Sequence, residues 1–304
     1  MKLGTSTNMF YRHRGENEKP SYAEKVAMIA DAGFDVADIH FCDSVRPRWN
    51  DALASDGWER AIDEAGEAAA ARGITFSQSH SPFNPYLFTR GRQPNAETLE
   101  LLAEMTRRSI IASGKLGVKW MVFHPLNDTV NCEYDTDIEL KTNREYYAPI
   151  LEQCKKAGVG MALENMFNFS PADYRRSYCE NPEDLISLVD SFDDPAVGIC
   201  WDFGHANFMI SDQPRALRKV GSRLKATHVQ DNRGDVDSHL IPFVGGNIKW
   251  EKIMPCLREI GYEGDFVYEA QNYTQDFPDA LKPDAAKFAV EVGRYLLRMY
   301  EGNN

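Results

Sequence analysis

The sequence has no long apolar run, and none of its segments approaches the ~18 consecutive apolar residues of a membrane-spanning helix. Residues 1–20 have no apolar segment ahead of Arg12, Arg14 and Glu16, so we expect no secretory signal. The six cysteines are scattered and form no Cys-x-x-Cys pair: Cys42, Cys132, Cys154, Cys179, Cys200 and Cys256. In a chain of this size they are typical of reduced, mostly buried thiols, and we expect a cytoplasmic protein with no membrane partner.

The sequence has fewer basic than acidic residues: 34 Lys and Arg against 46 Asp and Glu, which gives a net charge of −12. Because nucleic acids and anionic membranes are bound by clustered Lys and Arg, this balance argues against a nucleic-acid partner. The sequence also lacks the G-x-G-x-x-G and P-loop patterns that usually follow an early strand in a doubly wound nucleotide-binding sheet.

What the sequence does contain is an alternation of short β-rich apolar segments and longer helical segments, which is typical of a parallel sheet. We expect strands at residues 2–7, 34–41, 74–80, 118–124, 160–164, 197–202, 224–229 and 264–269. We expect helices at residues 22–32, 58–71, 95–116, 143–157, 215–220, 250–260 and 285–300, and one starting at Asn181. Eight alternations without a linker predict one α/β domain over residues 1–304, a single (β/α)8 TIM barrel, rather than a doubly wound open sheet.

Acids and histidines stand where these strands end. In order along the chain they are His80, His124, Glu164, Asp202 with His205, His228 and Glu269, and the loop after the seventh strand adds Asp237 and His239. Of the seven histidines, only His13 and His40 fall outside this set. The active site of such a barrel lies at the C-terminal ends of its strands, so we expect these side chains to converge.

Imidazole and carboxylate ligands together favour Zn, Mn, Fe or Co, whereas an all-oxygen set suits Mg or Ca. The last four strands end in Glu164, Asp202, His228 and Glu269, a set that predicts a site for one divalent metal. Two alternatives remain open. The set could form buried ion pairs, and Asp202 could simply cap the helix that follows its strand.

Several segments resemble the xylose isomerase-like TIM-barrel superfamily and, within it, the sugar phosphate isomerase/epimerase group. They are Leu-Glu-Asn-Met at 163–166, Cys-Trp-Asp-Phe-Gly-His-Ala-Asn at 200–207, Thr-His-Val-Gln-Asp at 227–231 and Tyr-Glu at 268–269. The loop 237–248 is similar to the Asp-x-His-x-x-Pro-Gly-x-Gly-x-Ile loop of that group, except that Phe243 stands where the group has Gly.

The resemblance implies a metal-dependent sugar isomerase or epimerase that acts on a ketose, a sugar or an inositol-type polyol. Glu164, Asp202, His228 and Glu269 would hold one divalent ion (Mn, Zn, Co, Fe or Mg). Glu164 and Glu269 would also be the acid/base pair that moves a proton through an enediolate. The resemblance further implies substrate contacts from His205, Arg233, His124 and His80.

Two other enzymes of the superfamily remain as alternatives. The residues after Glu164 depart from the 3-epimerase pattern, which leaves a lyase of the inosose dehydratase type open. The rim residues also resemble the nine ligands of endonuclease IV-type multi-zinc phosphodiesterases, in which Asp237 and His239 would bind additional metal. The net charge, and the acids Asp128, Glu133, Asp135, Asp137 and Glu139 after the fourth strand, argue against a DNA substrate. A barrel that only binds sugar is disfavoured by the intact pair of glutamates.

Two expected rim loops are rich in aromatic residues and arginine: Phe83, Tyr86, Phe88, Arg90 and Arg92 in one, and Phe167, Phe169, Tyr174, Arg175 and Arg176 in the other. The aromatic rings could stack on a sugar, and the arginines could meet a phosphate or carboxylate. Alternatively, the rings pack the loops or form the interface of a homo-oligomer.

Overall fold

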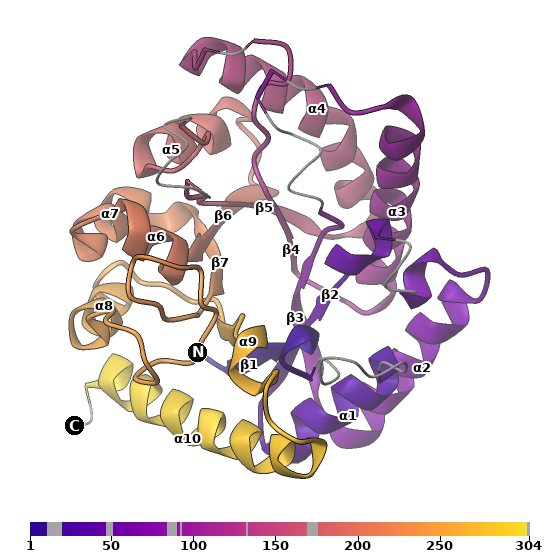
Figure 1. Cartoon of the computed structure of the whole chain (residues 1–304), viewed down its shortest axis with the longest axis vertical. Coiled ribbons are helices and arrows are strands. Elements are labelled where there is room, and N and C mark those ends of the chain that lie inside the picture. Colours follow the sequence, from indigo (N-terminus) through magenta and orange to yellow (C-terminus); the bar gives the residue numbers. More distant parts are fainter. Residues whose placement is uncertain are drawn as a thin grey trace.

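The structure, a computed structural model, describes residues 1–10, 20–46, 51–83, 90–91, 93–131, 133–168 and 176–302. Eight parallel strands run in the order β7-β6-β5-β4-β3-β2-β1-β8. They are β1 (Leu3–Ser6), β2 (Val36–His40), β3 (Thr75–His80), β4 (Trp120–Phe123), β5 (Gly160–Glu164), β6 (Val197–Asp202), β7 (Leu224–His228) and β8 (Phe266–Tyr268). A parallel bridge between Val229 and Tyr268 joins β7 to β8. The predicted (β/α)8 barrel is confirmed, and Figure 1 looks along it.

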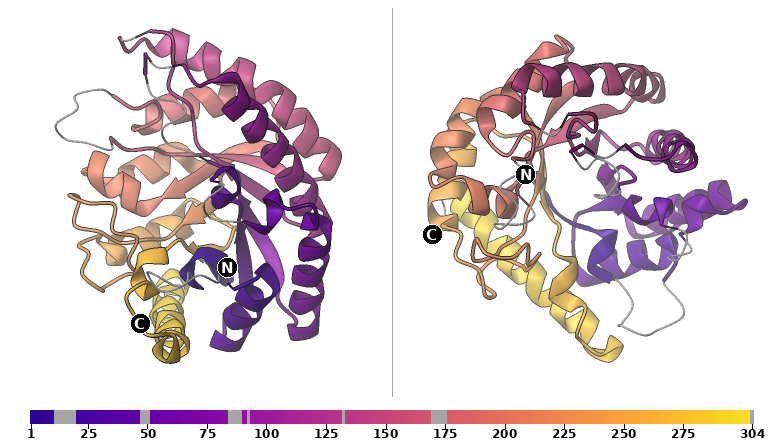
Figure 2. Two further views of the ribbon diagram at one scale, coloured as in Figure 1. Left: turned by 45° about the vertical axis from the view of Figure 1, so that its right-hand side comes forward. Right: turned by 45° about the horizontal axis from the view of Figure 1, so that its top comes forward.

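Helices surround the strands on the outside of the barrel, as Figures 1 and 2 show. They are α1 (Tyr22–Ala32), α2 (Trp58–Arg72), α3 (Ala96–Lys115), α4 (Thr136–Ala157), α5 (Pro182–Ser191), α7 (Gln213–Val220), α8 (Trp250–Glu259) and α10 (Lys282–Glu301). Two short helices, α6 (Phe203–Met209) and α9 (Gln271–Thr274), follow the ends of β6 and β8. Short 3-10 segments are η1 (Thr7–Phe10), η2 (Cys42–Val45), η4 (Ala52–Ala54), η5 (Gly221–Arg223) and η6 (Asp279–Leu281). The last helix, α10, packs against both α8 and α1 and so completes the ring.

Most helix limits follow from capping residues that the sequence displays. Ser21 and Glu24 form the capping box that starts α1, and Gly33 ends that helix in the left-handed conformation. The expected start of α4 at Asn143 is wrong, because the helix begins seven residues earlier at Thr136. The side chain of Asp135 accepts hydrogen bonds from the backbone of Asp137 and Ile138, and this cap starts the helix there. The last helix likewise begins at Lys282 rather than at residue 285, with a proline in its first turn.

The interior of the barrel contains one layer of small side chains, which we call the interior layer: Val122, Ala162, Cys200 and Ala226, from four consecutive strands. The ladders pair Val122 with Ala162 and Cys200 with Ala226. Side chains alternate between the two faces of a strand, so residues two positions further along also point into the barrel. Those positions are His124, Glu164, Asp202 and His228.

Among the described residues, no helix combines the length and the apolar character that crossing a membrane requires.

Candidate functional site

The ends of β5 to β8 bring four metal-ligating side chains together, which we call the quartet: Glu164, Asp202, His228 and Glu269. One ligand atom from each lies within 4.8 Å of the other three, and all four residues are buried. His228 Nδ1 is 2.9 Å from Glu164 Oε1 and 3.3 Å from Glu269 Oε2. Three carboxylates and an imidazole at these separations form a set that could surround one divalent cation.

The two oxygens of Asp202 face different partners. Oδ1 caps α6 by accepting the backbone N–H of His205 at 2.7 Å, and it also accepts from Gln230 Nε2 at 3.3 Å. Oδ2 is buried and has no hydrogen-bond partner among the described residues. A buried carboxylate oxygen without a donor is costly, and a cation would supply the missing partner. Asp202 is therefore both the helix cap and a candidate metal ligand.

The quartet holds three carboxyl groups against one imidazole, so negative charge is in excess. Burial raises the pKa of Asp202 to about 7, and the nearby Glu164 and Glu269 carboxylates act in the same direction, against the opposing effect of His205. Burial also acts on Glu164, but the imidazoles of His228 and His124 outweigh it and hold the pKa of Glu164 well below its usual range. The protein alone thus keeps one carboxyl of the quartet close to protonation at neutral pH. A divalent cation fits this surplus of negative charge.

Four further groups of three possible ligands lie around the quartet among the described residues, and two of them contain the other five residues that the sequence placed at the rim. On one side His124 Nε2 lies 2.9 Å from Glu164 Oε2 and 3.0 Å from His80 Nε2. On the other side His239 Nε2 lies 2.7 Å from Asp237 Oδ2, which is also 3.8 Å from His205 Nε2. Each of these triads has ligand atoms within 4.8 Å of one another. The nine residues that the sequence placed at the rim are therefore together in space.

The flanking histidines are held by the backbone of the rim. His205 Nδ1 lies 2.9 Å from the carbonyl of Asn165, and the ring stacks on Phe167 with centroids 4.5 Å apart. His239 Nδ1 lies 2.9 Å from the carbonyl of Glu269. Burial would lower the pKa values of His205 and His239, but the carboxylates of Asp202 and Asp237 raise both pKa values to about 10. Metal binding by the group of His205, Asp237 and His239 would therefore release protons.

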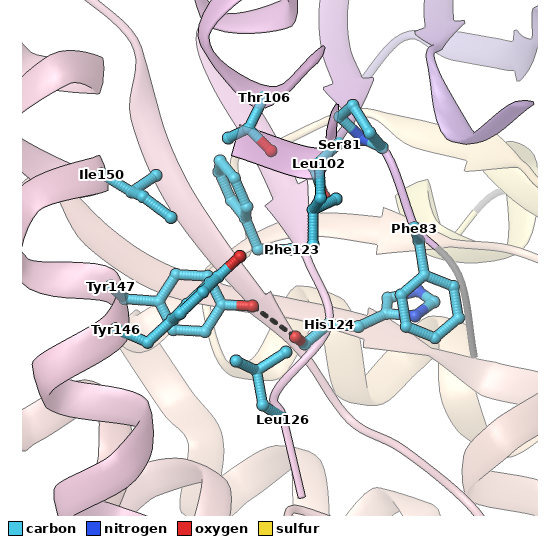
Figure 3. Close-up of a pocket in the computed structure, with 11 residues that line it drawn as sticks. Ser81, Phe83, Leu102, Thr106, Phe123, His124, Leu126, Tyr146, Tyr147 and Ile150 are labelled. Carbon is cyan, nitrogen blue, oxygen red and sulfur yellow. Dashed lines mark hydrogen bonds between the residues drawn. The ribbon is translucent and has the colours of Figure 1, made fainter. Parts of the chain in front are cut away.

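His124 also borders a small apolar space outside the barrel (Figure 3). The hydroxyl of Tyr147 donates to the His124 carbonyl at 2.5 Å, and the ring of Phe83 lies 4.0 Å from the imidazole. The space measures about 20 Å³, which is the size of one water molecule and too small for a sugar. Its lining fixes the backbone that carries His124.

Other predicted rim residues have partners of their own. Arg233 is exposed and its Nε donates to the carbonyl of Gly245 at 2.8 Å, and no interaction among the described residues links it to the quartet. Arg90 forms a buried ion pair with Glu139, and Arg176 binds Glu180 and Asp184. Several expectations fall outside the described residues: those on His13, Tyr86, Phe88, Arg92, Phe169, Tyr174 and Arg175.

Of the five acids after the fourth strand, Asp128 and Glu139 are buried and the other three are exposed. Glu139 is buried against Arg90, and Asp135 caps α4. Asp128 accepts hydrogen bonds from the backbone of Val130 and Asn131 and shapes its own loop. Glu133, Asp135 and Asp137 are exposed. The argument against a nucleic-acid substrate therefore rests on the net charge and on these three exposed acids.

Sequence reasoning missed two buried residues of β2, Asp38 and His40. His40 Nε2 lies 3.2 Å from Asp38 Oδ2 and 3.7 Å from Glu269 Oε1. The signal was present, because His40 stands at the end of its strand and Asp38 shares its face. An acid in the middle of a buried strand, two residues before a histidine, marks this position.

The family model for the xylose isomerase-like TIM barrel matches residues 26–293 of the chain. Protein MJ1311 of Methanocaldococcus jannaschii is 30% identical over 196 residues, which are 64% of this chain and 64% of that protein. A D-psicose 3-epimerase of Ruminiclostridium cellulolyticum is 24% identical over 266 residues, covering 86% of this chain and 80% of the relative. An inosose dehydratase of Clostridium perfringens is 22% identical over 200 residues, or 60% of this chain and 65% of the relative. The chain thus spans less than two thirds of the first and third relatives.

Solved structures share the fold over nearly the whole chain. A D-tagatose 3-epimerase-like protein superimposes with a TM-score of 0.75 at 22% identity, covering 99% of both chains. The IolI protein with a bound zinc atom gives a TM-score of 0.74 at 17% identity, again over 99% of both chains. The strand order, the rim residues and the family model agree, and this chain belongs to the xylose isomerase-like TIM barrel family.

Proposed function

We propose that the chain is a metal-dependent sugar isomerase or epimerase that moves a proton on a ketose or an inositol-type polyol. The observation that carries the proposal is the quartet, in which Glu164 from the end of β5 and Glu269 from the end of β8 approach the same nitrogen of His228. The proposal is supported by relatives named as a D-psicose 3-epimerase and an inosose dehydratase, and by a structural neighbour that holds zinc.

The residues present fit a divalent ion. Asp202 Oδ2 lacks a donor, three carboxylates converge, and His228 directs Nδ1 at two of them. The nitrogen ligand favours Mn, Co, Fe or Zn over Mg. When bound, such an ion would polarise the carbonyl of the substrate and stabilise the negative charge that develops on proton removal.

The protein itself supplies the proton transfer. The pKa of Glu269, like that of Glu164, is lowered, because nearby imidazoles outweigh the effect of burial. Both carboxylates are thus ionised at neutral pH and able to accept a proton from carbon. One glutamate would remove the proton and the other, once protonated, would return one to the opposite face. The enediolate is the intermediate expected between these two steps.

The flanking residues would bind the sugar. His205 and Phe167 form a stacked pair beside Asp202, and His80 and His124 lie on the opposite side of Glu164. Their imidazoles can exchange hydrogen bonds with hydroxyl groups of a sugar. Arg233, whose Nε donates to the carbonyl of Gly245, would contact a substrate through its Nη atoms.

The test is the pair of variants Glu164→Gln and Glu269→Gln, assayed with ketoses such as psicose and tagatose, in free and phosphorylated form, and with an inosose. We expect each variant to lose at least roughly 100-fold in turnover, because loss of a positioned acid or base typically costs 10²–10⁴-fold. Exchange of the substrate C–H with deuterated water, followed by NMR, reports the proton transfer directly.

The matched control is Glu263→Gln, an exposed glutamate ahead of β8 and away from the quartet, which should keep wild-type turnover. Metal content measured on every variant separates lost proton transfer from lost metal. Near wild-type turnover in either quartet variant would contradict the two-glutamate mechanism. If the product of an inosose has lost the elements of water, the enzyme is a lyase that uses the same base.

A multi-zinc phosphodiesterase is a second candidate, because three groups of possible ligands, two of which share Glu164, together contain all nine rim residues. Three metals would allow hydrolysis by a metal-activated water. Elemental analysis of protein purified without added metal or chelator distinguishes the two functions. About one metal per chain would favour the isomerase, whereas about three zincs with phosphodiester hydrolysis would favour the second candidate.

A further inference from the structure

Asp38 is a fully buried carboxylate that the quartet does not use. It lies in the middle of β2 with an exposed fraction of 0%. Its Oδ2 atom is 3.2 Å from His40 Nε2 and 3.6 Å from His228 Nε2. Removing a carboxylate from water costs several kcal/mol unless partners satisfy it, so a carboxylate at this position requires a role.

The two ring nitrogens of His228 face opposite ways. Nδ1 faces the carboxylates of Glu164 and Glu269, which belong to the quartet, while Nε2 lies 3.6 Å from Asp38 Oδ2 and has no hydrogen-bond partner among the described residues. A histidine that ligates a metal through one nitrogen carries its proton on the other, and that N–H needs an acceptor. Among the described residues, Asp38 is the acid that lies within 4 Å of Nε2.

Gln78 fixes the spacing between Asp38 and β7. Its Nε2 donates to Asp38 Oδ2 at 3.1 Å and to the carbonyl of Thr227 at 3.2 Å. Thr227 immediately precedes His228, and its own hydroxyl donates to the carbonyl of Asp265 at 2.8 Å. Gln78 therefore ties the carboxylate from β2 to the backbone of the histidine that it faces across the barrel.

We propose that Asp38 is a positioning residue: it accepts the Nε2 proton of His228 and so fixes the tautomer and ring orientation that present Nδ1 to the metal, while Gln78 holds Asp38 in place. The inference deepens the proposed function and rests on the metal site within it. It adds Asp38 and Gln78 to that site as residues that support a metal ligand, and neither belongs to a sequence motif of the rim.

The experiment measures metal binding alone. Metal-free wild type, Asp38→Asn and Gln78→Met are titrated with Co²⁺ and Mn²⁺ by calorimetry, and the visible absorption of the Co²⁺ forms is recorded. We expect Asp38→Asn to bind roughly 10- to 100-fold more weakly, as is typical when the acceptor behind a metal-bound histidine is lost. We also expect an altered Co²⁺ spectrum, because the imidazole is no longer held in one orientation.

Gln78→Met keeps the buried volume but removes the amide, so it should weaken binding in the same direction and by less. It also provides the test if Asp38→Asn does not fold. Asp184→Asn is the matched control, a buried Asp→Asn change among Tyr134, Arg176 and Asn181, and it should leave affinity and spectrum unchanged. Thermal unfolding of the metal-free proteins identifies any variant that has lost its fold.

Wild-type affinity and spectrum in both Asp38→Asn and Gln78→Met would overturn the proposal, and so would a wild type that binds neither metal. The failure of the proposed function looks different: the wild type would bind metal and Asp38→Asn would weaken binding, yet no sugar would be turned over. In that case the positioning role of Asp38 would stand for a metal centre with another reaction.

Discussion

At the scale of single residues, Asp202 shows how one side chain can satisfy two interpretations of the same sequence. One oxygen caps α6, as a structural acid would, and the other remains without a donor inside the quartet. The two roles do not compete, because a carboxylate has two oxygens that point in different directions. Phe243, the residue that departs from the resembled loop pattern, has a left-handed backbone with φ of 68°, a conformation that a bulky side chain rarely adopts.

Asp202 also gives a prediction for pH dependence in the metal-free protein. Its pKa in the folded protein, about 7, is above the usual value for Asp, so the folded state binds this proton more tightly than the unfolded state does. The contribution to stability is present at acid pH and is lost as the pH rises from about 4 through 7. Asp202→Asn removes this loss and keeps an oxygen for the helix cap.

We therefore expect metal-free Asp202→Asn to gain stability relative to wild type as the pH increases from 5 to 8, by about 1 kcal/mol or more. One unit of pKa difference corresponds to about 1.4 kcal/mol. Urea unfolding in the presence of a chelator at both pH values measures the difference. A stability difference that stays constant between pH 5 and pH 8 would show that Asp202 is not held near protonation by its neighbours.

At the scale of secondary-structure elements, α4 shows how a polar residue can anchor a helix. Asn143, which the sequence suggested as the helix start, lies inside the helix and is fully buried. Its side chain accepts from the N–H of Leu126 at 2.7 Å and donates to the carbonyl of Leu126 at 2.8 Å. These bonds attach α4 to the loop that follows β4 and His124.

We predict that Asn143→Leu lowers the free energy of unfolding by about 2–4 kcal/mol, because it leaves a buried N–H and a buried carbonyl of Leu126 without partners, each at about 1–3 kcal/mol. Urea unfolding of the variant and of the exposed control Lys141→Ala measures this loss. A loss below about 0.5 kcal/mol would mean that water or a shifted loop satisfies Leu126.

At the scale of the whole molecule, the site exists because the barrel closes. The quartet stands at the ends of β5 to β8, and the residues that face it come from β2, β3 and β4. The two sets meet only when β8 pairs with β1 and bridges to β7. A ligand that binds the folded chain and not the unfolded chain must stabilise this closed state.

We accordingly expect a chelator to lower the melting temperature and Mn²⁺, Co²⁺ or Zn²⁺ to raise it. At a free metal concentration of 100 times the dissociation constant, the gain is about 2.7 kcal/mol. The gain should be larger at pH 8 than at pH 5, because protons compete with the metal for the imidazole of His228 and the carboxylates. Differential scanning calorimetry at both pH values tests this, and a melting temperature insensitive to metal and chelator at pH 8 would contradict a metal site in the quartet.

The sequence by itself determined the barrel, its strand ends and the nine rim residues. These features depend on local order: side chains alternate along a strand, caps set helix ends, and parallel strands deliver their last residues to one rim. The position of α4 was predictable only in part, because Asp135 and Asn143 are both good caps and the choice depends on contacts with Leu126.

Only the tertiary structure decided which side chains face each other across the barrel. Asp38 of β2 lies 3.6 Å from His228 of β7, 190 residues further along the chain, and Gln78 of β3 donates to the carbonyl of Thr227, 149 residues further along. No spacing in the sequence encodes these contacts. The tertiary structure also decided that Arg90 and Arg176 form ion pairs with acids from other elements, rather than facing a phosphate or carboxylate of a substrate. Burial and charge pairing depend on the closed barrel, and therefore on the whole fold.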